Sequence, residues 1–142
     1  MKSVRQLLEA KGRQVWSVSP SDSVFEAIRR MAEHEIGAVV VLDGAHFLGI
    51  LTERDYARKV ILHGRHSKDV RVAEVMSSPT PTATLDDTVE DCMEKMTRQR
   101  VRHLPILDNE RLVGIVSIGD LVKSIIDEQK DRIETLEQYI YS

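Results

Sequence analysis

The sequence has little cysteine, few aromatic residues and no long apolar run. Its single cysteine, Cys92, excludes an intramolecular disulfide and offers no metal-binding framework. Aromatic residues make up only 4% of the 142 residues, so we expect an aliphatic core. No apolar run approaches the roughly 20 residues that span a bilayer, and residues 1–16 lack the apolar stretch of a secretory signal. These absences predict a cytoplasmic protein without a membrane span of its own.

An excess of positive charge is also lacking. The formal net charge is −3, whereas a general nucleic-acid-binding protein normally carries a basic excess. No Gly-rich phosphate loop of the P-loop or Rossmann kind is present. Hydrophobic residues at 42% and charged residues at 30% are ordinary for a globular protein of this length. We therefore expect a compact globular protein that does not bind nucleic acid.

The chain contains a tandem repeat. Residues 23–57 align without a gap with residues 88–122, at an offset of 65 (88 − 23 = 65). The lead-in at residues 4–8 likewise resembles residues 72–76. The expected organisation is a first repeat with its N-terminal segment at 1–65, a linker at 66–71, a second repeat at 72–126 and a helical extension at 127–142.

The hydrophobic periodicity changes twice within each copy. Helical spacing comes first, preceded by Ser23 with Glu26 and by Thr88 with Asp91, which resemble capping boxes, the second in a weaker form. Two apolar strands joined by a hairpin signal follow, and then a second helix. The expected strands are 38–42 and 47–51 in the first copy, and 104–107 and 112–116 in the second.

Each copy thus reads as strand, helix, two strands and helix. One copy of about 60 residues buries too little surface to be securely stable alone. We therefore predict an α/β (α+β) fold in which tandem βαββα units pack as a pseudo-two-fold pair.

A long helix is expected from Gly119 to about Tyr141. Its apolar stripe continues past the end of the repeat, so part of it needs another surface. A second subunit in a symmetric dimer supplies that surface most simply; the alternative is that the helix folds back on its own domain. The stripe consists of Leu121, Val122, Ile125, Ile126, Ile133, Leu136 and Ile140.

The most specific feature is a duplicated strand-to-helix junction. Gly49-Ile-Leu-Thr52-Glu-Arg-Asp55 and Gly114-Ile-Val-Ser117-Ile-Gly-Asp120 share the pattern glycine, two apolar residues, hydroxyl, two variable residues, aspartate. A carboxylate beside a helix N-terminus can accept two hydrogen bonds from a ribose diol. The alternative is that each hydroxyl and aspartate is only an ordinary helix cap.

These junctions, the tandem βαββα repeat and the strand Arg-His-Leu-Pro-Ile-Leu-Asp at 102–108 resemble the cystathionine-β-synthase (CBS) domain pair. The resemblance covers nearly the whole chain, from about Val4 to Ile126. It implies a ligand module rather than a catalyst, with AMP, ADP, ATP, NAD or S-adenosylmethionine bound in two pseudo-symmetric clefts. No catalytic residue and no metal are expected.

The resemblance also assigns roles to individual residues. Thr52 and Asp55 are expected to bind the ribose in one cleft, and Ser117 and Asp120 in the other. Arg54, Arg102 and His103 are expected to bind phosphate. The first strand of each copy, around Ser17-Val18 and around Thr82-Ala83, is expected to line the adenine pocket. Gly37 and Pro105 are expected to complete that pocket.

Carried over in this way, the two clefts are unequal. Arg102 and His103 would face the phosphate of the nucleotide held by Asp55, while their counterparts Gly37 and Ala38 cannot serve the other cleft. Arg54 is expected to reach across instead, which its counterpart Gly119 cannot do. The alternative for the basic residues Arg98, Arg100 and Arg102 is a solvated face with helix-end charges.

Other candidate residues have simpler interpretations. His63 and His66 have no cysteine or aspartate cluster beside them and are expected to be a surface pair rather than a metal site. Cys92 lies on the apolar side of a helix and is expected in the core rather than as a nucleophile. Trp16 either anchors the N-terminal segment or touches a ligand.

The sequence therefore predicts an adenine-nucleotide sensor, as a homodimer, that acts on a separate effector protein by population shift. One alternative is a dimeric interaction or scaffold protein that works independently of nucleotide. A third hypothesis is a small enzyme acting on a nucleotide, with His103 as acid or base.

Overall fold

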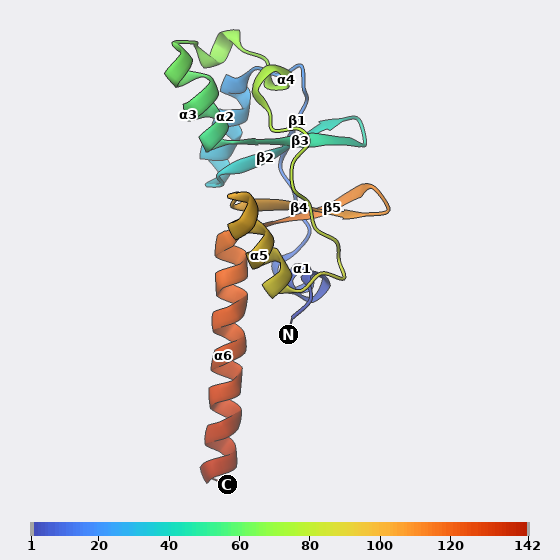
Figure 1. Ribbon diagram of the computed structural model, residues 1–142, viewed down its shortest axis with the longest axis vertical. Helices are drawn as coiled ribbons and strands as arrows, with labels where there is room; N and C mark the ends of the chain where they lie inside the picture. Colours follow the sequence, from blue (N-terminus) through green and yellow to red (C-terminus); the bar gives the residue numbers. More distant parts are fainter. Residues whose placement is uncertain (1, 142) are drawn as a thin grey trace. The chain divides into compact units, whose positions relative to one another are not determined.

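The computed structural model describes residues 2–141, which form two compact units (Figure 1). We call one the first-repeat unit; it comprises Gln14–Thr80 with Asp108–Leu112. Of the described residues, the second-repeat unit comprises 2–13, Pro81–Leu107 and 113–141. Within the described part, no helix combines the length and the apolar character that crossing a membrane requires.

The first-repeat unit is built on a three-stranded sheet in the order β1-β2-β3. β1 runs parallel to β2, so the chain needs a crossover between them, and α2 supplies it. β2 and β3 are antiparallel and need only a tight turn, in which Gly44 has the positive φ of 62° that hairpin turns favour. The elements are β1 (Ser17–Val18), α2 (Val24–His34), β2 (Ala38–Asp43), β3 (His46–Thr52), α3 (Glu53–Lys59), η1 (Ile61–His63), η2 (Ser67–Asp69) and α4 (Val72–Val75).

The second-repeat unit repeats this order with a smaller sheet, in which only β4 and β5 are paired strands. The expected first strand is reduced to one parallel bridge between Ala83 and Ile106. The Ala83 N–H donates to the Pro105 carbonyl at 3.0 Å, and the Leu107 N–H donates to the Ala83 carbonyl at 2.9 Å. The elements are α1 (Val4–Lys11), α5 (Val89–Gln99), β4 (His103–Asp108), β5 (Arg111–Ser117) and α6 (Ile118–Tyr141).

The caps of α2 and α5 differ from the expectation in one respect. Thr88 and Asp91 form the complete reciprocal box on α5, whereas on α2 only the Ser23 side chain caps. The carboxylate of Glu26 is engaged by Arg29 at 2.7 Å and by Arg30 at 3.3 Å, and so does not complete the box. The prediction that the second box is the weaker one was therefore wrong.

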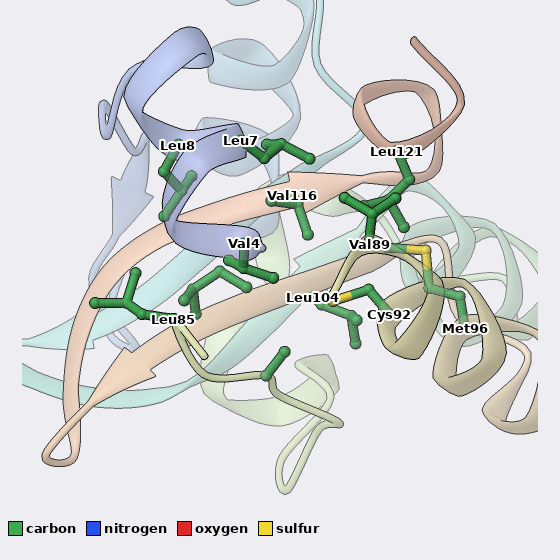
Figure 2. Close-up of a cluster of buried hydrophobic side chains, with 12 residues drawn as sticks. Val4, Leu7, Leu8, Leu85, Val89, Cys92, Met96, Leu104, Val116 and Leu121 are labelled. Atoms are coloured by element: carbon green, nitrogen blue, oxygen red, sulfur yellow. The ribbon is translucent and has the colours of Figure 1, made fainter. Parts of the chain in front are cut away.

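Each unit has its own aliphatic core. In the second-repeat unit, side chains from α1, α5, β4, β5 and the start of α6 meet in one cluster (Figure 2). Cys92 lies in this cluster, which confirms its core interpretation. Burial raises the pKa of its thiol to about 11, so it stays protonated at neutral pH.

The two lead-in segments are exchanged between the units. Val4 and Leu8 of α1 are buried in the cluster of the second-repeat unit, and the Val4 N–H donates to the Asp87 carbonyl at 2.8 Å. Val72 of α4 is buried in the cluster of the first-repeat unit, and its N–H donates to the Asp22 carbonyl at 2.8 Å. The expected divisions at 1–65 and 72–126 therefore differ from the compact units, because burial and backbone pairing join segments that are distant in sequence.

Candidate functional site

Both predicted junctions are helix starts with the same hydrogen bonds. The Asp55 N–H donates to Thr52 Oγ1 at 3.0 Å, and the Thr52 N–H donates to Asp55 Oδ2 at 3.1 Å. The Asp120 N–H donates to Ser117 Oγ at 3.1 Å, and the Ser117 N–H donates to Asp120 Oδ2 at 2.8 Å. The cap interpretation therefore holds at both junctions, and any ligand role of the two acids is additional to capping.

Asp55 is held by further groups of the first-repeat unit. Ser77 Oγ donates to Oδ1 at 3.0 Å, and Lys59, one turn along α3, places its ammonium 3.1 Å from the same oxygen. Ser77 is itself fixed by a two-way backbone bridge with Ile50. The Asp55 side chain is only 9% exposed. This acid is buried and rigidly held.

Asp120 is more accessible and has a different partner. Its side chain is 25% exposed, and the Lys11 ammonium lies 2.5 Å from Oδ2. Lys11 comes from the end of α1 and also donates to the Ile115 carbonyl at 2.6 Å. Asp120 therefore sits beside a helix N-terminus, a hydroxyl and a positive charge.

The charges around Asp120 shift two pKa values. Burial opposes ionisation of Asp120, but the Lys11 ammonium and the Ser117 N–H outweigh it and hold the pKa of this carboxyl below its usual range. Burial, followed by repulsion from Lys11, lowers the pKa of His103, although Asp120 acts the other way. At neutral pH, His103 is therefore an uncharged hydrogen-bonding group.

Replacing Lys11 by methionine tests this ion pair. A carboxyl with a lowered pKa in the folded state adds stability above its unfolded pKa, and that stability disappears as the pH falls through the folded pKa. We expect Lys11→Met to cost no more than about 1 kcal/mol at pH 7, because the pair is partly exposed. The cost in free energy of unfolding should shrink below about pH 4. Urea unfolding of Lys11→Met and the wild type at pH 7 and at about pH 3 measures this change.

The matched control is Lys123→Met on the exposed part of α6, which should leave the free energy of unfolding nearly unchanged at every pH. A carboxyl NMR titration should also show the midpoint of Asp120 rising in Lys11→Met. A cost that is the same at pH 7 and pH 3 would contradict the assigned pair.

The predicted adenine residues fall into two groups. The side chains of Val18 and Ala83 belong to the hydrophobic clusters of their units, so these residues can offer a ligand only their backbone. Pro105 is buried as well, and its carbonyl accepts the Ala83 N–H. Three predicted residues keep partial exposure: Ser17, Gly37 and Thr82.

The predicted phosphate residues lie in both units. Arg102 is exposed directly before β4, and its carbonyl accepts the N–H of Ile118 at 2.9 Å, at the start of α6. His103 is half-buried, and this burial is the main cause of its lowered pKa. Arg54 is exposed on α3, next to Asp55.

The remaining candidates have structural roles. Trp16 stacks on His34 with ring centroids 3.4 Å apart, which favours the anchoring interpretation. His63 and His66 are exposed. Within residues 2–141, no group of three or more histidine, cysteine or acidic side chains is placed to hold a metal ion.

An apolar hollow of about 550 Å³ opens between α2 and α3 of the first-repeat unit. Gly37 is the only predicted site residue in its lining, and Asp55 is not part of it. The hollow and the predicted ribose acid are therefore separate features. Its lining comprises Ile28, Met31, Ala32, Glu35, Ile36, Gly37, Glu53, Tyr56, Ala57 and Ile61.

Three residues at the two acids escaped the sequence analysis: Lys11, Lys59 and Ser77. Lys59 lies four residues after Asp55, a spacing that places both on one helix face and could have been recognised. Ser77 and Lys11 carry no such signal, because they lie 22 and 109 residues from their acids. Only the tertiary structure brings them to the site.

Comparison with known proteins agrees with the repeat. The family model for the CBS domain matches residues 5–62 and again 72–127. CBS domain-containing protein YhcV of Bacillus subtilis is 36% identical over 121 residues, which cover 85% of this chain and 84% of that protein. The first curated relatives are matched over 60% to 84% of their own lengths, so the chain spans about two thirds of several of them.

Solved structures share the fold of most of the chain. A candidate signal-transduction protein with CBS domains from Burkholderia ambifaria is 47% identical, with a TM-score of 0.87 over 90% of this chain and 96% of that chain. A more distant CBS domain pair, of protein MJ0100, was solved with 5′-methylthioadenosine and S-adenosyl-L-methionine. At 23% identity and a TM-score of 0.79, over 90% of this chain and 98% of that chain, its likeness shows the fold alone.

Proposed function

The chain belongs to the CBS domain family, and on that premise we propose that it is a cytoplasmic regulatory module that binds an adenosyl nucleotide and signals to a partner protein. Proteins built from CBS pairs are regulatory and signal-transduction modules. The finer parts of the proposal are the ligand class, the acids that hold it and the way the signal is passed on.

The observation that carries the proposal is the environment of Asp120. A partly exposed carboxylate at the start of a helix can accept hydrogen bonds from both hydroxyls of a ribose, and the Ser117 hydroxyl can add a third. The Lys11 ammonium beside it can attract a phosphate. These donors and acceptors fit a nucleoside phosphate, since they offer one anion for the sugar and one cation for the phosphate.

The adenosyl class is supported by the family and by one structural neighbour. The CBS pair of MJ0100 binds two ligands that share an adenosine moiety. For this chain we propose AMP, ADP or ATP, with NAD as a further ligand of one site. No metal is part of the proposal.

The two acids should differ in affinity. Asp55 is buried and held by Ser77 and Lys59, so a ribose must compete with those contacts. Asp120 is more exposed, and ribose binding there requires only that Lys11 move. We therefore expect tighter binding at Asp120. The assignment of Arg102 and His103 to the nucleotide held by Asp55 stays a prediction.

Signalling would follow from population shift. Nucleotide binding favours one of two conformations, and the shift cannot exceed the difference in ligand affinity between them. A partner protein would then recognise the favoured conformation. We propose a homodimer as the working form and a non-catalytic role for the chain.

The test is ligand-induced stabilisation of the wild type and of single-acid variants. Under a thermal-shift assay with AMP, ADP, ATP, NAD and S-adenosylmethionine, a ligand at 100 times its Kd should stabilise the wild type by about 2.7 kcal/mol. Asp120→Ala should lose most of this gain and Asp55→Ala part of it. Calorimetry on the same variants gives the number of sites.

The matched control is Asp91→Ala. Asp91 occupies the same third helical position in the capping box of α5, so its loss removes a cap but no proposed ligand site. It should lower the free energy of unfolding by about 1 kcal/mol and keep the full ligand-induced gain. A wild type that none of the five compounds stabilises would contradict nucleotide sensing and favour the nucleotide-independent scaffold.

A further inference from the structure

The C-terminal half of α6 is exposed along its whole length. Leu121 and Ser124, near its start, are buried, whereas every residue from Gln129 to Tyr141 is exposed. Figure 1 shows α6 continuing well past α1 and α5 toward the C-terminus. An isolated helical segment of this length is only marginally stable in water, so a packing surface is expected to stabilise it.

The exposed apolar residues of α6 follow a heptad repeat. In a heptad written a to g, residues 126, 133 and 140 occupy the a positions, and residues 122, 129 and 136 occupy the d positions. The buried Leu121 and Ser124 fall at c and f, so the a/d stripe points away from the core of the second-repeat unit. Ile133, Leu136 and Ile140 of this stripe are 55%, 61% and 70% exposed. The a/d stripe consists of Val122, Ile126, Gln129, Ile133, Leu136 and Ile140.

The residue types at these positions favour two parallel strands. All three a positions are isoleucine, and leucine occupies d at 136, the combination that favours parallel dimers. Gln129 is the one polar residue in the stripe. In a parallel pair in register it meets Gln129 of the second copy, and the two amides can hydrogen-bond to each other. A shifted or antiparallel pair would leave this amide against aliphatic side chains, so Gln129 selects the register.

The flanking charges are complementary in the same arrangement. Arg132 occupies g and Glu137 occupies the following e position, and these positions face each other across a parallel coiled coil. Arg132 also lies 3.6 Å from Glu128 of its own helix. Both residues are exposed, so Arg132 can reach the glutamate of a second copy without desolvating a buried charge.

We propose that the C-terminal half of α6 forms a parallel, two-stranded coiled coil with α6 of a second copy of this chain, along the stripe from Val122 to Ile140. This inference deepens the homodimer that belongs to the proposed function. It requires no nucleotide, so it can be tested apart from ligand binding.

The first test is the mass of the full chain in solution. Sedimentation velocity at tens of micromolar, without nucleotide, should give twice the chain mass of 16.1 kDa for the wild type. Ile133→Glu with Ile140→Glu should reduce the mass to that of one chain. The matched control, Thr135→Glu with Gln138→Glu, adds the same charge at the c and f positions and should stay dimeric.

The second test fixes the direction of the helices. Under mild oxidation followed by alkylation, Leu136→Cys should cross-link to Leu136→Cys of the second copy, since d positions meet at one level in a parallel pair. Gln138→Cys, on the outer face, should not cross-link. Cys92 is buried and should not react in the folded protein.

A monomeric wild type, or a dimer that the double glutamate variant leaves intact, would overturn the proposal. A dimer without the Leu136→Cys cross-link would overturn the parallel arrangement. Thermal shift with nucleotide on the double glutamate variant separates the two proposals. If the monomeric double glutamate variant still gains stability from the ligand, the dimer is not needed for binding. If the wild type is a dimer that no ligand stabilises, only the proposed sensing role is contradicted.

Discussion

Gly49→Ala should destabilise the protein by about 3 kcal/mol or more, because the glycine lies against a neighbouring backbone. A Cβ built on Gly49 would lie 2.3 Å from the Ser77 carbonyl oxygen and 3.1 Å from Ser78 Cβ. That carbonyl accepts the Ile50 N–H at 3.1 Å, and the Ser77 N–H donates back to Ile50 at 2.8 Å. The methyl group must therefore break this bridge or displace the segment that carries Ser77. The displacement would also move the Ser77 hydroxyl away from Asp55.

The equivalent glycine of the second repeat is the matched control. A Cβ on Gly114 would meet only the ends of the Leu8 side chain, at 3.0 and 3.1 Å. A leucine side chain can shift by a few tenths of an ångström, so Gly114→Ala should cost about 1 kcal/mol. Urea unfolding of both variants measures the difference. If Gly49→Ala and Gly114→Ala lowered the free energy of unfolding equally, the close approach of residues 77 and 78 to β3 would be contradicted.

Leu104→Ala should cost about 3–4 kcal/mol, since it removes a fully buried side chain from the centre of the second-repeat core. Figure 2 shows Leu104 on β4 among side chains of α1 and α5. With so few aromatic residues in the chain, the core is made of aliphatic groups that are packed from several elements at once. The cavity left by alanine cannot be filled from one side, so most of the lost contacts should stay lost.

Leu62→Ala provides the same chemical change at the surface. Leu62 lies on η1 with 77% of its surface exposed, so its removal should change the free energy of unfolding by less than about 0.5 kcal/mol. Chemical unfolding followed by circular dichroism compares the two variants. If Leu104→Ala proved as mild as Leu62→Ala, the cluster around β4 would not be the core of this unit.

The order of elements was predictable because its signals are local. Caps, helical periodicity and hairpin turns depend on residues within about four positions of one another, and the 65-residue repeat presents each signal twice. The strands expected at 38–42 and 104–107 correspond to β2 and β4 to within one residue at each end. The cap of α2 was misjudged because Arg29 and Arg30 compete with the Ser23 backbone N–H for the Glu26 carboxylate. The spacing of Ser23 and Glu26 does not show that the two arginines win.

The first strand of the second repeat shows where local signals stop. Its counterpart in the first repeat, β1, pairs with β2 over two residues, whereas Ala83 makes a single bridge to Ile106. Two-residue strands have no periodicity of their own. Their existence depends on how closely the neighbouring strand approaches, which a linear pattern does not contain.

The sequence by itself determined the repeated order of helix, hairpin and helix, the helix that begins at each hydroxyl–aspartate pair and the apolar stripe of the last helix. The reason is that each of these follows from residue type at fixed short spacing. Only the tertiary structure decided which charge stands beside each acid. Lys11 reaches Asp120 because α1 packs into the core of the second repeat, and Ser77 reaches Asp55 because its backbone pairs with β3. Burial of apolar surface and backbone pairing place these groups, and neither depends on distance along the chain.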